Sequence, residues 1–332
     1  KQFLGREVDV ITPNGFEKSI TPPEEQFPEY EARARKKLIE VASIMSGEQY
    51  EEDALLICIS GRYECTNKGI DIFIDALSRL NSGGYKGKPV LAFIMVPSGH
   101  NGPDKELLAK LHGADSNYTT NVSHLLSDDY DMVENRLRAL KLNNSSGDKV
   151  KVFFIPTYLN GSDGIFDMSY YDLLVGMDLT VFPSYYEPWG YTPLESLAFK
   201  VPTVTTTLAG FGLWVQEHYP KDKSRKSIDI ITRTDSNYDE VVNDVVNRIR
   251  EIAALSPAEK KSYKENAKEV SEIALWENNI KYYKRAFSLA IEKLVEAKGE
   301  FLGIVDDMPQ SYNKLTTNDP FWTNVLVNRE LP

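Results

Sequence analysis

Residues 54–69 read ALLICISGRYECTNKG and join a short apolar run to a loop that carries two cations. A run of this length that is almost wholly apolar is typical of a strand covered on both faces, as in a parallel sheet. The pattern over residues 68–80 is amphipathic and predicts a helix. This stretch therefore predicts a strand, a loop and a helix, the beginning of a βαβ unit.

The same alternation continues along the chain. Short apolar runs predict strands at 54–60, 89–96, 149–155, 178–182, 203–206 and 227–231. Amphipathic stretches between them predict helices at 68–80, 128–142, 170–175, 193–199 and 238–255. This order predicts an α/β fold, a Rossmann-like doubly wound parallel sheet with flanking helices.

The flanking regions differ in pattern. Residues 11–15 indicate a strand followed by a turn, and residues 29–46 a charged helix. Residues 97–125 are rich in Gly, Ser, Asn and Thr and predict a long loop with a short helix at 105–111. We expect three parts: 1–49, a linker strand and helix; 50–255, the Rossmann-like domain; and 256–332, C-terminal helices followed by an irregular tail.

Composition limits the classes of partner. The chain has 332 residues and a net charge of −11, with 49 acidic against 38 basic side chains. Nucleic acid or an anionic membrane as main partner is excluded on this ground, because phosphate-rich surfaces bind a basic face. A phosphorylated ligand remains compatible if a few basic residues converge locally.

The cysteines and the ends of the chain carry weaker signals. Cys58 lies in an apolar run and Cys65 in a loop, and neither has metal-ligand spacing. With no signal peptide and no apolar stretch long enough for a bilayer, we expect a cytoplasmic location. The chain begins at Lys1 without methionine, so we expect a fragment of a longer protein.

The loop after the first strand could hold a diphosphate. Arg62 offers a planar fork of donors and Lys68 a mobile point charge, and both lie between a strand and a helix. The alternative is an ordinary solvated loop in which these cations pair with Glu64. Spacing alone does not separate the two interpretations.

Residues 182–195 read FPSYYEPWGYTPLE and carry the strongest signal. A strand runs into an aromatic turn, and a helix then opens for which Thr192 is expected as N-cap, with Glu195 completing a capping box. The amides of residues 190–194 could bind phosphate oxygens, and Gly190 would admit a ligand close to the backbone. Glu187, among aromatic residues, needs a partner if it is buried.

Other motifs are weaker. Residues 208–212, LAGFG, follow an expected strand and permit a tight turn or a close backbone approach to a ligand. Asp129 and Asp131 form a DxD pattern, but it opens an acidic helix where Asp is favoured by the dipole, so we reject it as a metal site. The four histidines are scattered without ligand spacing.

Taken together, the loops at 61–69, 182–193 and 210–212 resemble the C-terminal half of the eukaryote-type glycogen synthases, over roughly residues 8 to 295. Glu187 and Glu195 match the E-x7-E signature of many retaining GT-B glycosyltransferases. The resemblance implies a GT-B enzyme that transfers glucose from UDP-glucose to a growing α-1,4-glucan with retention and without a metal or other cofactor. We expect a bacterial member of the family.

Roles for individual residues also follow from the resemblance. Arg62 and Lys68 would grip the diphosphate and stabilise the leaving UDP, and Glu187 would contact the donor glucose near the reacting centre. Glu195 would bind the ribose hydroxyls, Tyr170 would stack on uracil, and the amides of residues 190–192 would face the phosphates. The substrate-binding set that the resemblance implies is Glu195, Tyr170, Gly190, Tyr191, Thr192 and Trp189.

The chain departs from the family in two respects. The family's N-terminal domain is not found before Lys1, so we expect the chain to bind donor but to be inactive without that partner domain. A homo-oligomer is compatible with the family. The stretch 256–270 has lysines where animal and fungal members carry arginines that sense glucose 6-phosphate. We predict no activation of the full-length protein by that sugar; several-fold activation would contradict this.

Two alternatives stay open at this point. The chain could be a non-catalytic module that binds a sugar nucleotide or a carbohydrate, although the presence of Arg62, Lys68, Glu187 and Glu195 together favours an enzyme. It could also belong to a GT-B transferase with another donor, such as ADP-glucose. Tyr170 and the wording of the motifs favour UDP.

Overall fold

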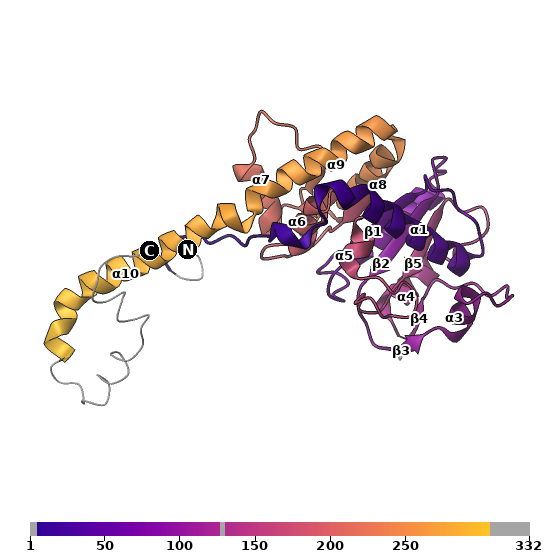
Figure 1. Cartoon of the computed structure of the whole chain (residues 1–332), viewed down its shortest axis with the longest axis horizontal. Coiled ribbons are helices and arrows are strands. Elements are labelled where there is room, and N and C mark those ends of the chain that lie inside the picture. The colour runs from indigo at the N-terminus through magenta and orange to yellow at the C-terminus, as the bar shows by residue number, and fades with distance from the viewer. Residues whose placement is uncertain (1–4, 127–129, 306–332) are drawn as a thin grey trace. The chain divides into compact units, whose positions relative to one another are not determined.

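The computed structural model of the chain describes residues 5–126 and 130–305 (Figure 1). The chain divides into two compact units. The larger is Pro13–Asn279, and the smaller joins Lys1–Thr12 to Ile280–Pro332. The sheet and all the candidate site residues belong to the larger unit.

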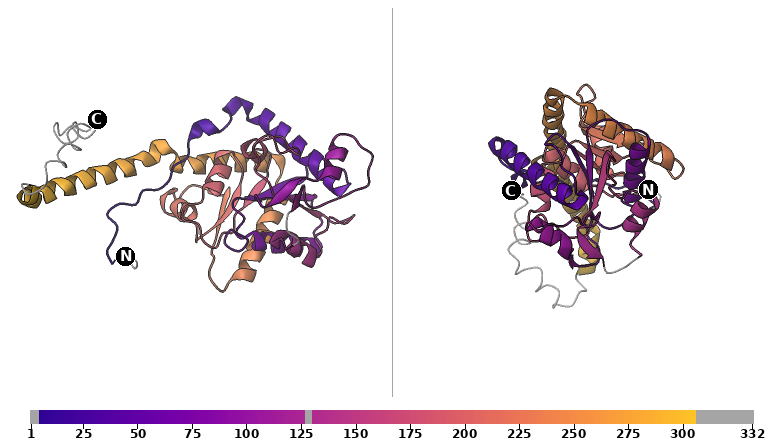
Figure 2. Two further views of the ribbon diagram at one scale, coloured as in Figure 1. Left: turned by 90° about the horizontal axis from the view of Figure 1, so that it is seen from below. Right: turned by 90° about the vertical axis from the view of Figure 1, so that its right-hand side faces the viewer.

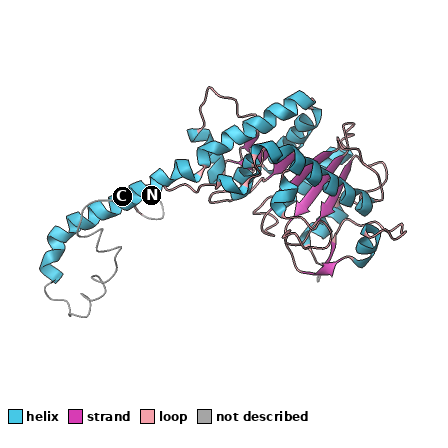
Figure 3. Cartoon of the chain, in the orientation of Figure 1, coloured by secondary structure: helices cyan, strands magenta, loops and turns pink. Residues whose placement is uncertain are grey.

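The larger unit is built on a six-stranded sheet in which all strand pairs are parallel (Figure 3). Its strands are β1 (Leu55–Ser60), β2 (Val90–Met95), β5 (Val150–Phe154), β6 (Leu179–Val181), β7 (Thr203–Thr206) and β8 (Ile228–Ile231). They lie in the order β5-β2-β1-β6-β7-β8. The strand order reverses between β1 and β6, and ligands of doubly wound folds bind beyond the carboxyl ends of the strands at such a point.

Helices cover both faces of this sheet (Figure 2). The α-helices of the larger unit are α1 (Phe27–Ser46), α2 (Ile70–Ser82), α3 (Lys105–Leu111), α4 (Met132–Ala139), α5 (Tyr170–Leu174), α6 (Tyr191–Ala198), α7 (Gly210–His218), α8 (Tyr238–Ala254) and α9 (Pro257–Ser271). Short 3-10 turns are η1 (Lys18–Ile20), η2 (Glu24–Gln26) and η3 (Glu272–Ala274). On one face, α2, α4 and α8 share a core with the strands. α1 and α5 pack together on the other face.

The residues of β1 explain why this strand is central. Leu55, Ile57 and Ile59 enter the core shared with α2 and α8, and all residues of the strand are buried. Full burial of each such side chain stabilises the fold by about 1.5–3 kcal/mol. β1 pairs with β2 from Leu55 opposite Val90 to Ser60 opposite Met95, so both strands end together at the crevice.

The expected doubly wound sheet is confirmed, with each strand within one residue of its expected bounds. The short helix expected at 105–111 is confirmed as α3, whereas α4 is shorter than the helix expected at 128–142. Residues 97–125 were expected to hold no strand, and this is wrong. They contain β3 (His100–Pro103) and most of β4 (His124–Leu126), which pair antiparallel.

The strand expected at 11–15 is also wrong. The structure has no strand there, and the neighbouring Phe16 forms a single parallel bridge with Leu275. Its amide donates to the carbonyl of Ala274 at 2.9 Å. The domain boundaries expected at 1–49, 50–255 and 256–332 stay a prediction.

α10 (Trp276–Val305) continues from the larger unit into the smaller one. Within the smaller unit, Lys293 Nζ donates to Asp9 Oδ1 at 2.6 Å. The irregular tail expected at the C-terminus lies outside the described residues. Across the described ranges, no helix combines the length and the apolar character that crossing a membrane requires.

Candidate functional site

A cavity of about 520 Å³ opens at the carboxyl ends of β1 and β2, beside the point where the strand order reverses. Its walls come from the end of β1 and the loop after it, from the loop after β5, and from the starts of α5 and α6. The lining residues are Ser60, Gly61, Arg62, Tyr63, Met95, Pro97, Thr157, Tyr158, Leu159, Tyr170, Thr192 and Glu195. We call it the crevice pocket.

The loop after β1 presents Arg62 at the rim of the crevice pocket. Its side chain is 73% exposed, and Nη1 lies 2.8 Å from Glu64 Oε1. An exposed pair of this kind contributes little to stability, so the guanidinium can exchange Glu64 for an anionic ligand at small cost. The pairing with Glu64 forms, and Arg62 also lines the crevice pocket. Its expected contact with a diphosphate stays a prediction.

Lys68 has a different environment from Arg62. Its Nζ forms an ion pair with Glu187 Oε2, and the side chains are 14% and 20% exposed. The sequence required a partner for Glu187, and Lys68 from the other loop is that partner. The pair places a cation and a carboxylate side by side. Neither residue is among the lining of the crevice pocket.

The segment after β6 differs from expectation at the start of α6. The N-cap is Gly190, with φ 102°, and no side chain caps the helix. The expected capping box of Thr192 and Glu195 is therefore wrong. The positive φ of Gly190 favours glycine, and the N-cap lies two residues before Thr192, so that α6 begins at Tyr191. Glu195 is thereby free to face the crevice pocket, whose lining it joins.

Glu195 is half-buried and receives a hydrogen bond from a neighbouring helix. Tyr171 Oη on α5 donates to Glu195 Oε1 at 2.9 Å. Burial raises the pKa of Glu195 above its usual value, and the bond from Tyr171 acts in the opposite direction. A carboxylate in this setting is a strong acceptor for hydroxyl donors when it is ionised.

Tyr170 forms one wall of the crevice pocket. Its hydroxyl lies 2.7 Å from Ser60 Oγ at the end of β1. Its ring lies 5.5 Å from that of Tyr171, at an angle of 54°. Burial raises the pKa of Tyr170 well above its usual value, so the hydroxyl is neutral at ordinary pH. The half-buried ring is suited to stacking against a planar ligand.

Trp189 packs away from the crevice pocket. Its ring lies 5.8 Å from that of Phe211 and 6.0 Å from that of Trp214, both on α7. Its indole Nε1 is buried without a hydrogen-bond partner among the described residues. Its expected role in substrate binding stays a prediction, and the contacts with α7 give it a packing role.

The glycines at 210 and 212 are explained by backbone packing. A Cβ at Gly210 would lie 2.2 Å from the carbonyl oxygen of Pro188, and one at Gly212 would lie 2.7 Å from that of Thr206. The amide of Gly210 donates to the Glu187 carbonyl at 3.0 Å. At these glycines, backbone carbonyls of the chain itself make the close approach that was expected of a ligand. The hydrogen bond from Gly210 holds the loop of Glu187 against α7.

The structure brings four of the predicted residues together: Arg62, Tyr170, Thr192 and Glu195 line the crevice pocket. Lys68 and Glu187 form an adjacent pair, with Gly190 beside them, since a Cβ there would lie 3.4 Å from Glu187 Cγ. Tyr191 at the start of α6 is 44% exposed.

Sequence reasoning missed Ser60 and Tyr158, which line the crevice pocket, and Tyr171, which bonds Glu195. It also did not mark Arg233, which contacts the segment after β6. Tyr158 is 77% exposed and follows β5, so the rule that ligands bind at the carboxyl ends of strands could have found it. Arg233 is buried, donates to the carbonyl of Pro183, and lies 5.2 Å from the Tyr185 ring. No sequence motif marked Arg233 or Tyr171.

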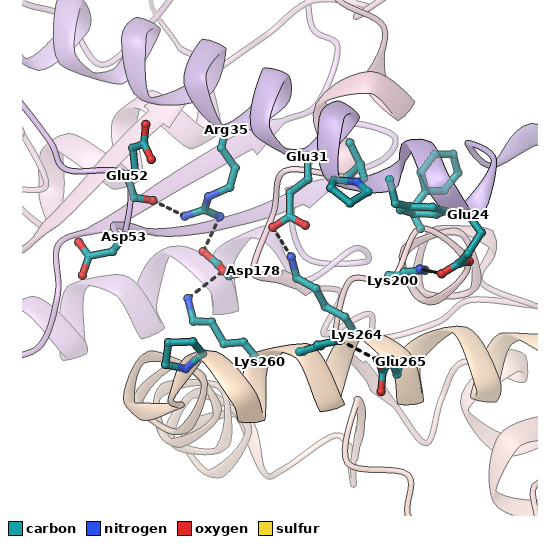
Figure 4. A pocket seen from close by; sticks show the side chains of 16 residues that line it. Glu24, Glu31, Arg35, Glu52, Asp53, Asp178, Lys200, Lys260, Lys264 and Glu265 are labelled. Carbon is teal, nitrogen blue, oxygen red and sulfur yellow. Dashed lines mark hydrogen bonds and ion pairs between the residues drawn. The ribbon is translucent and has the colours of Figure 1, made fainter.

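A second cavity, of about 530 Å³, lies at the amino-terminal ends of the strands, where Asp178 precedes β6 (Figure 4). Internal ion pairs cross it. Asp178 Oδ2 is 2.9 Å from Arg35 on α1, and Oδ1 is 3.0 Å from Lys260 on α9. Lys264 pairs with Glu31. These charges join α1 to α9, and we call them the α1–α9 ion pairs.

Among the described residues, no three His, Cys, Asp or Glu side chains are grouped closely enough to hold a metal ion. Asp131, of the rejected DxD pattern, is the N-cap of α4 and accepts from the Glu134 amide at 2.9 Å. It also accepts from Tyr63 Oη at 2.6 Å. Its helix-opening role is confirmed.

Comparison with known proteins identifies the relatives. A family model described as glycogen synthase matches residues 1–113 and 105–319. Glycogen [starch] synthase of Caenorhabditis elegans is 28% identical over 356 residues, covering 89% of this chain and 52% of that protein. Isoform 2 of the Saccharomyces cerevisiae enzyme is 27% identical over 362 residues, with 88% and 51% covered. The chain spans about half the length of the curated relatives it matches.

Solved structures give a weaker likeness. The glycosyltransferase WaaG, involved in lipopolysaccharide biosynthesis, is 15% identical with a TM-score of 0.42, over 79% of this chain and 51% of that one. Anabaena Alr3699/HepE in complex with UDP-glucose is 14% identical with a TM-score of 0.44, over 84% and 56%. These scores are too low to support conclusions about the site or its ligand.

Proposed function

The chain belongs to the glycogen synthase family, and from that premise we propose that it is the donor-binding half of a retaining glucosyltransferase that transfers glucose from UDP-glucose to an α-1,4-glucan. The observation that carries the proposal is the crevice pocket. Arg62, Tyr170 and Glu195 reach it from three separate segments. A cation, an aromatic face and a carboxylate are the groups that a diphosphate, a base and a ribose require.

The diphosphate lies between Arg62 and Lys68 in this proposal. Arg62 is 73% exposed and is paired with the Glu64 side chain, so its fork can exchange that partner for a phosphate. Lys68 keeps Glu187 while it contacts phosphate, because an ammonium has three donors. The two cations lower the barrier by stabilising the charge that develops on the leaving UDP, the task for which other transferases use a divalent ion.

Glu187 lies close to the reacting centre in this proposal. Its carboxylate is fixed by Lys68 on one side and by a backbone held against α7 on the other. A carboxylate fixed in this way can hydrogen-bond the hydroxyls of the donor glucose without reorganising as the bond to UDP breaks. The uncapped start of α6, which includes Gly190, Tyr191 and Thr192, presents its amides and dipole to the phosphates.

The base and ribose take the inner part of the crevice pocket. Uracil stacks on Tyr170, and the ribose hydroxyls donate to Glu195. Membership of the family supports UDP as the nucleotide of the donor. ADP is the alternative nucleotide, and the experiment must distinguish the two. The glucan acceptor and an N-terminal domain complete the enzyme in this proposal, which needs no metal or other cofactor. The location we propose is the cytoplasm, where glycogen is made.

Calorimetric titration with UDP and with ADP tests the proposal. We expect UDP to bind more tightly than ADP, and Arg62→Ala to weaken UDP binding by about tenfold, the usual loss for a charge-assisted contact. Glu195→Ala should weaken it by a similar factor. Arg138→Ala is the matched control: Arg138 is 65% exposed and paired with Glu134 on α4, like Arg62 with Glu64.

Three outcomes decide between the functions. UDP binding that both site variants weaken and the control leaves unchanged supports the donor site. Preference for ADP would identify a transferase with another donor. If neither nucleotide binds to the chain or to the longer protein, the donor site is refuted and the alternative of a carbohydrate-binding module gains support.

A further inference from the structure

Two consecutive tyrosines open α5, and each contacts a different wall of the crevice pocket. Tyr170 Oη lies 2.7 Å from Ser60 Oγ on β1. Tyr171 Oη donates to Glu195 Oε1 on α6 at 2.9 Å. One helix start therefore connects the strand end on one side with the carboxylate on the other. Sequence motifs marked Tyr170 and Glu195 and left Tyr171 without a role.

The first turn of α5 is fixed, which gives both hydroxyls defined positions. Ser169 and Asp172 form a reciprocal capping box. Arg33 on α1 lies 3.3 Å from Asp172. The amide of Tyr170 donates to the Leu159 carbonyl at 2.9 Å, in the loop that forms the facing wall. Capping of this kind stabilises a helix start by about 1 kcal/mol.

The ring of Tyr171 is fixed as well. It stacks on Phe199, just after α6, with centroids 5.1 Å apart and planes at 4°. The hydroxyl therefore reaches Glu195 from a ring held by aromatic packing. Replacement by Phe keeps this stack and removes only the donor, which makes Tyr171→Phe a clean probe of the hydrogen bond.

Glu195 depends on such a donor because it is half-buried. Burial raises the pKa of its carboxyl, and the bond from Tyr171 counteracts the rise. The other titratable side chains that line the same pocket are Arg62, Tyr63, Tyr158 and Tyr170. Arg62 is the cation among them, and it already has Glu64 at 2.8 Å.

We propose that Tyr171 is a positioning residue for the donor site: its hydroxyl holds one carboxylate oxygen of Glu195 so that the other accepts hydrogen bonds from the ribose diol of a nucleoside diphosphate. The proposal deepens the proposed function and rests on it. Tyr171 does not contact the nucleotide. It orients Glu195 and keeps the carboxylate ionised, since a protonated Glu195 loses acceptor strength towards the diol.

The test is the pH dependence of UDP binding by the chain, measured by calorimetry from pH 5.5 to 8.5. Without the Tyr171 donor the pKa of Glu195 rises further, so more of the carboxyl is protonated at the lower pH values. Tyr171→Phe should therefore weaken UDP binding about fivefold or more near pH 6, as expected for loss of a hydrogen bond to a charged group. The loss should shrink as pH rises.

Three controls separate positioning from general damage. Tyr170→Phe removes the hydroxyl that contacts neutral Ser60, so any loss it causes should not change with pH. 2′,3′-Dideoxy-UDP lacks the ribose hydroxyls, so Tyr171→Phe should leave its affinity unchanged. In Glu195→Ala the additional change Tyr171→Phe should have no effect on UDP binding, because the two residues act as a unit.

The outcomes are distinguishable. If Glu195→Ala weakens UDP binding and Tyr171→Phe matches the wild type at every pH, the role of Tyr171 is refuted and the donor site stands. A loss in Tyr171→Phe that is equal for UDP and dideoxy-UDP also refutes it, because it reports damage to packing. If UDP binds neither to the wild-type chain nor to the longer protein, the proposed function fails and this inference with it.

Discussion

At the scale of single residues, the Lys68–Glu187 pair joins loops that are 119 residues apart in the chain. Each side chain is largely shielded from water, so each charge needs the other. The pair is also where two predicted roles meet: Lys68 towards phosphate and Glu187 towards glucose. If the proposed roles hold, fold stability and donor binding depend on the same contact.

Lys68→Met should leave Glu187 without its cation and lower the free energy of unfolding by about 1–3 kcal/mol. The double variant Lys68→Met/Glu187→Gln should lose less than the sum of the two single changes, since no charge is then left unpaired. Urea unfolding of wild type, the two single variants and the double variant gives the coupling free energy between the two side chains.

The exposed pair Lys261–Glu265 is the matched control for that cycle. Its atoms are 4.0 Å apart and its side chains are 80% and 65% exposed. The change Lys261→Met should cost at most about 0.5 kcal/mol. If the losses in unfolding free energy from the two single changes at Lys68 and Glu187 simply add in the double variant, the pair stabilises the fold no more than this exposed pair does.

The sequence predicted several site residues correctly as members of one pocket, because strand ends can be placed from apolar runs. It failed at Glu195, where T-x-x-E indicated a capping box. Gly190 adopts φ 102° and is the N-cap in place of Thr192. No local sequence pattern predicts that backbone conformation. Tyr171 and Arg233 could not be predicted either, because their partners are distant in the chain and only tertiary packing brings them together.

At the scale of elements, α1 and α9 are joined by ion pairs. Asp178 lies between Arg35 and Lys260, and its Oδ2 also accepts from the Leu56 amide at 2.9 Å. Lys264 and Lys268 pair with Glu31 and Glu24. Three of the lysines at 256–270, where family members carry phosphate-sensing arginines, thus pair with carboxylates of other segments: Lys260, Lys264 and Lys268. Lys261 is 80% exposed and pairs within α9. Insensitivity to glucose 6-phosphate stays a prediction, and the three pairs with other segments support it.

Asp178 should make the fold sensitive to acid. Burial alone would raise the pKa of Asp178, but Arg35 and Lys260 outweigh it and hold the pKa below its usual value. A carboxyl with a lowered folded-state pKa contributes stability above its unfolded value, near about pH 4, and loses it as pH falls through the folded value. Asp178→Asn should therefore be less stable than wild type at pH 7, by about 1–3 kcal/mol.

The difference between Asp178→Asn and wild type should narrow below about pH 4. Thermal unfolding at a series of pH values measures it. Asp53 is a suitable control, since its pair with Lys88 is largely exposed. A difference in stability between Asp178→Asn and wild type that stays constant down to pH 2.5 would argue against ionised Asp178 paired with Arg35 and Lys260.

The six strands of the sheet could be predicted within a residue because each is a compact apolar run. The β3–β4 pair could not, since His100–Pro103 reads His-Asn-Gly-Pro and has no alternation of apolar and polar residues. The opposite error occurred at residues 11–15, where the sequence indicated a strand followed by a turn and the structure has no strand. Pairing geometry, and not composition, decides both cases.

At the scale of the whole molecule, the chain spans about half of its curated relatives. A GT-B enzyme needs two domains to enclose the donor, because closure orders the site and excludes water. The crevice pocket is open to solvent along the rim where Arg62 and Tyr158 lie exposed. We expect acceptor binding and catalysis to require the partner domain.

The chain alone should bind UDP but should not extend glycogen from UDP-glucose. The measurement is transfer of labelled glucose to glycogen, with the full-length protein as positive control. Turnover by the chain alone at a rate comparable to the full-length protein would contradict the need for a second domain. Glu187→Gln in the full-length protein is the negative control, since it should abolish transfer there.

The reversal of strand order has a consequence for how the protein acquires its site during synthesis. β1, β2 and β5 form one side of the sheet from a continuous stretch of chain, and β6, β7 and β8 form the other. The crevice pocket lies on the seam, with Arg62 made early and Glu195 made late. A nascent chain that ends before β6 can pair its first three strands, yet it holds only part of the crevice pocket. Until β6 is synthesised, one edge of β1 stays unpaired and open to incorrect strand pairing.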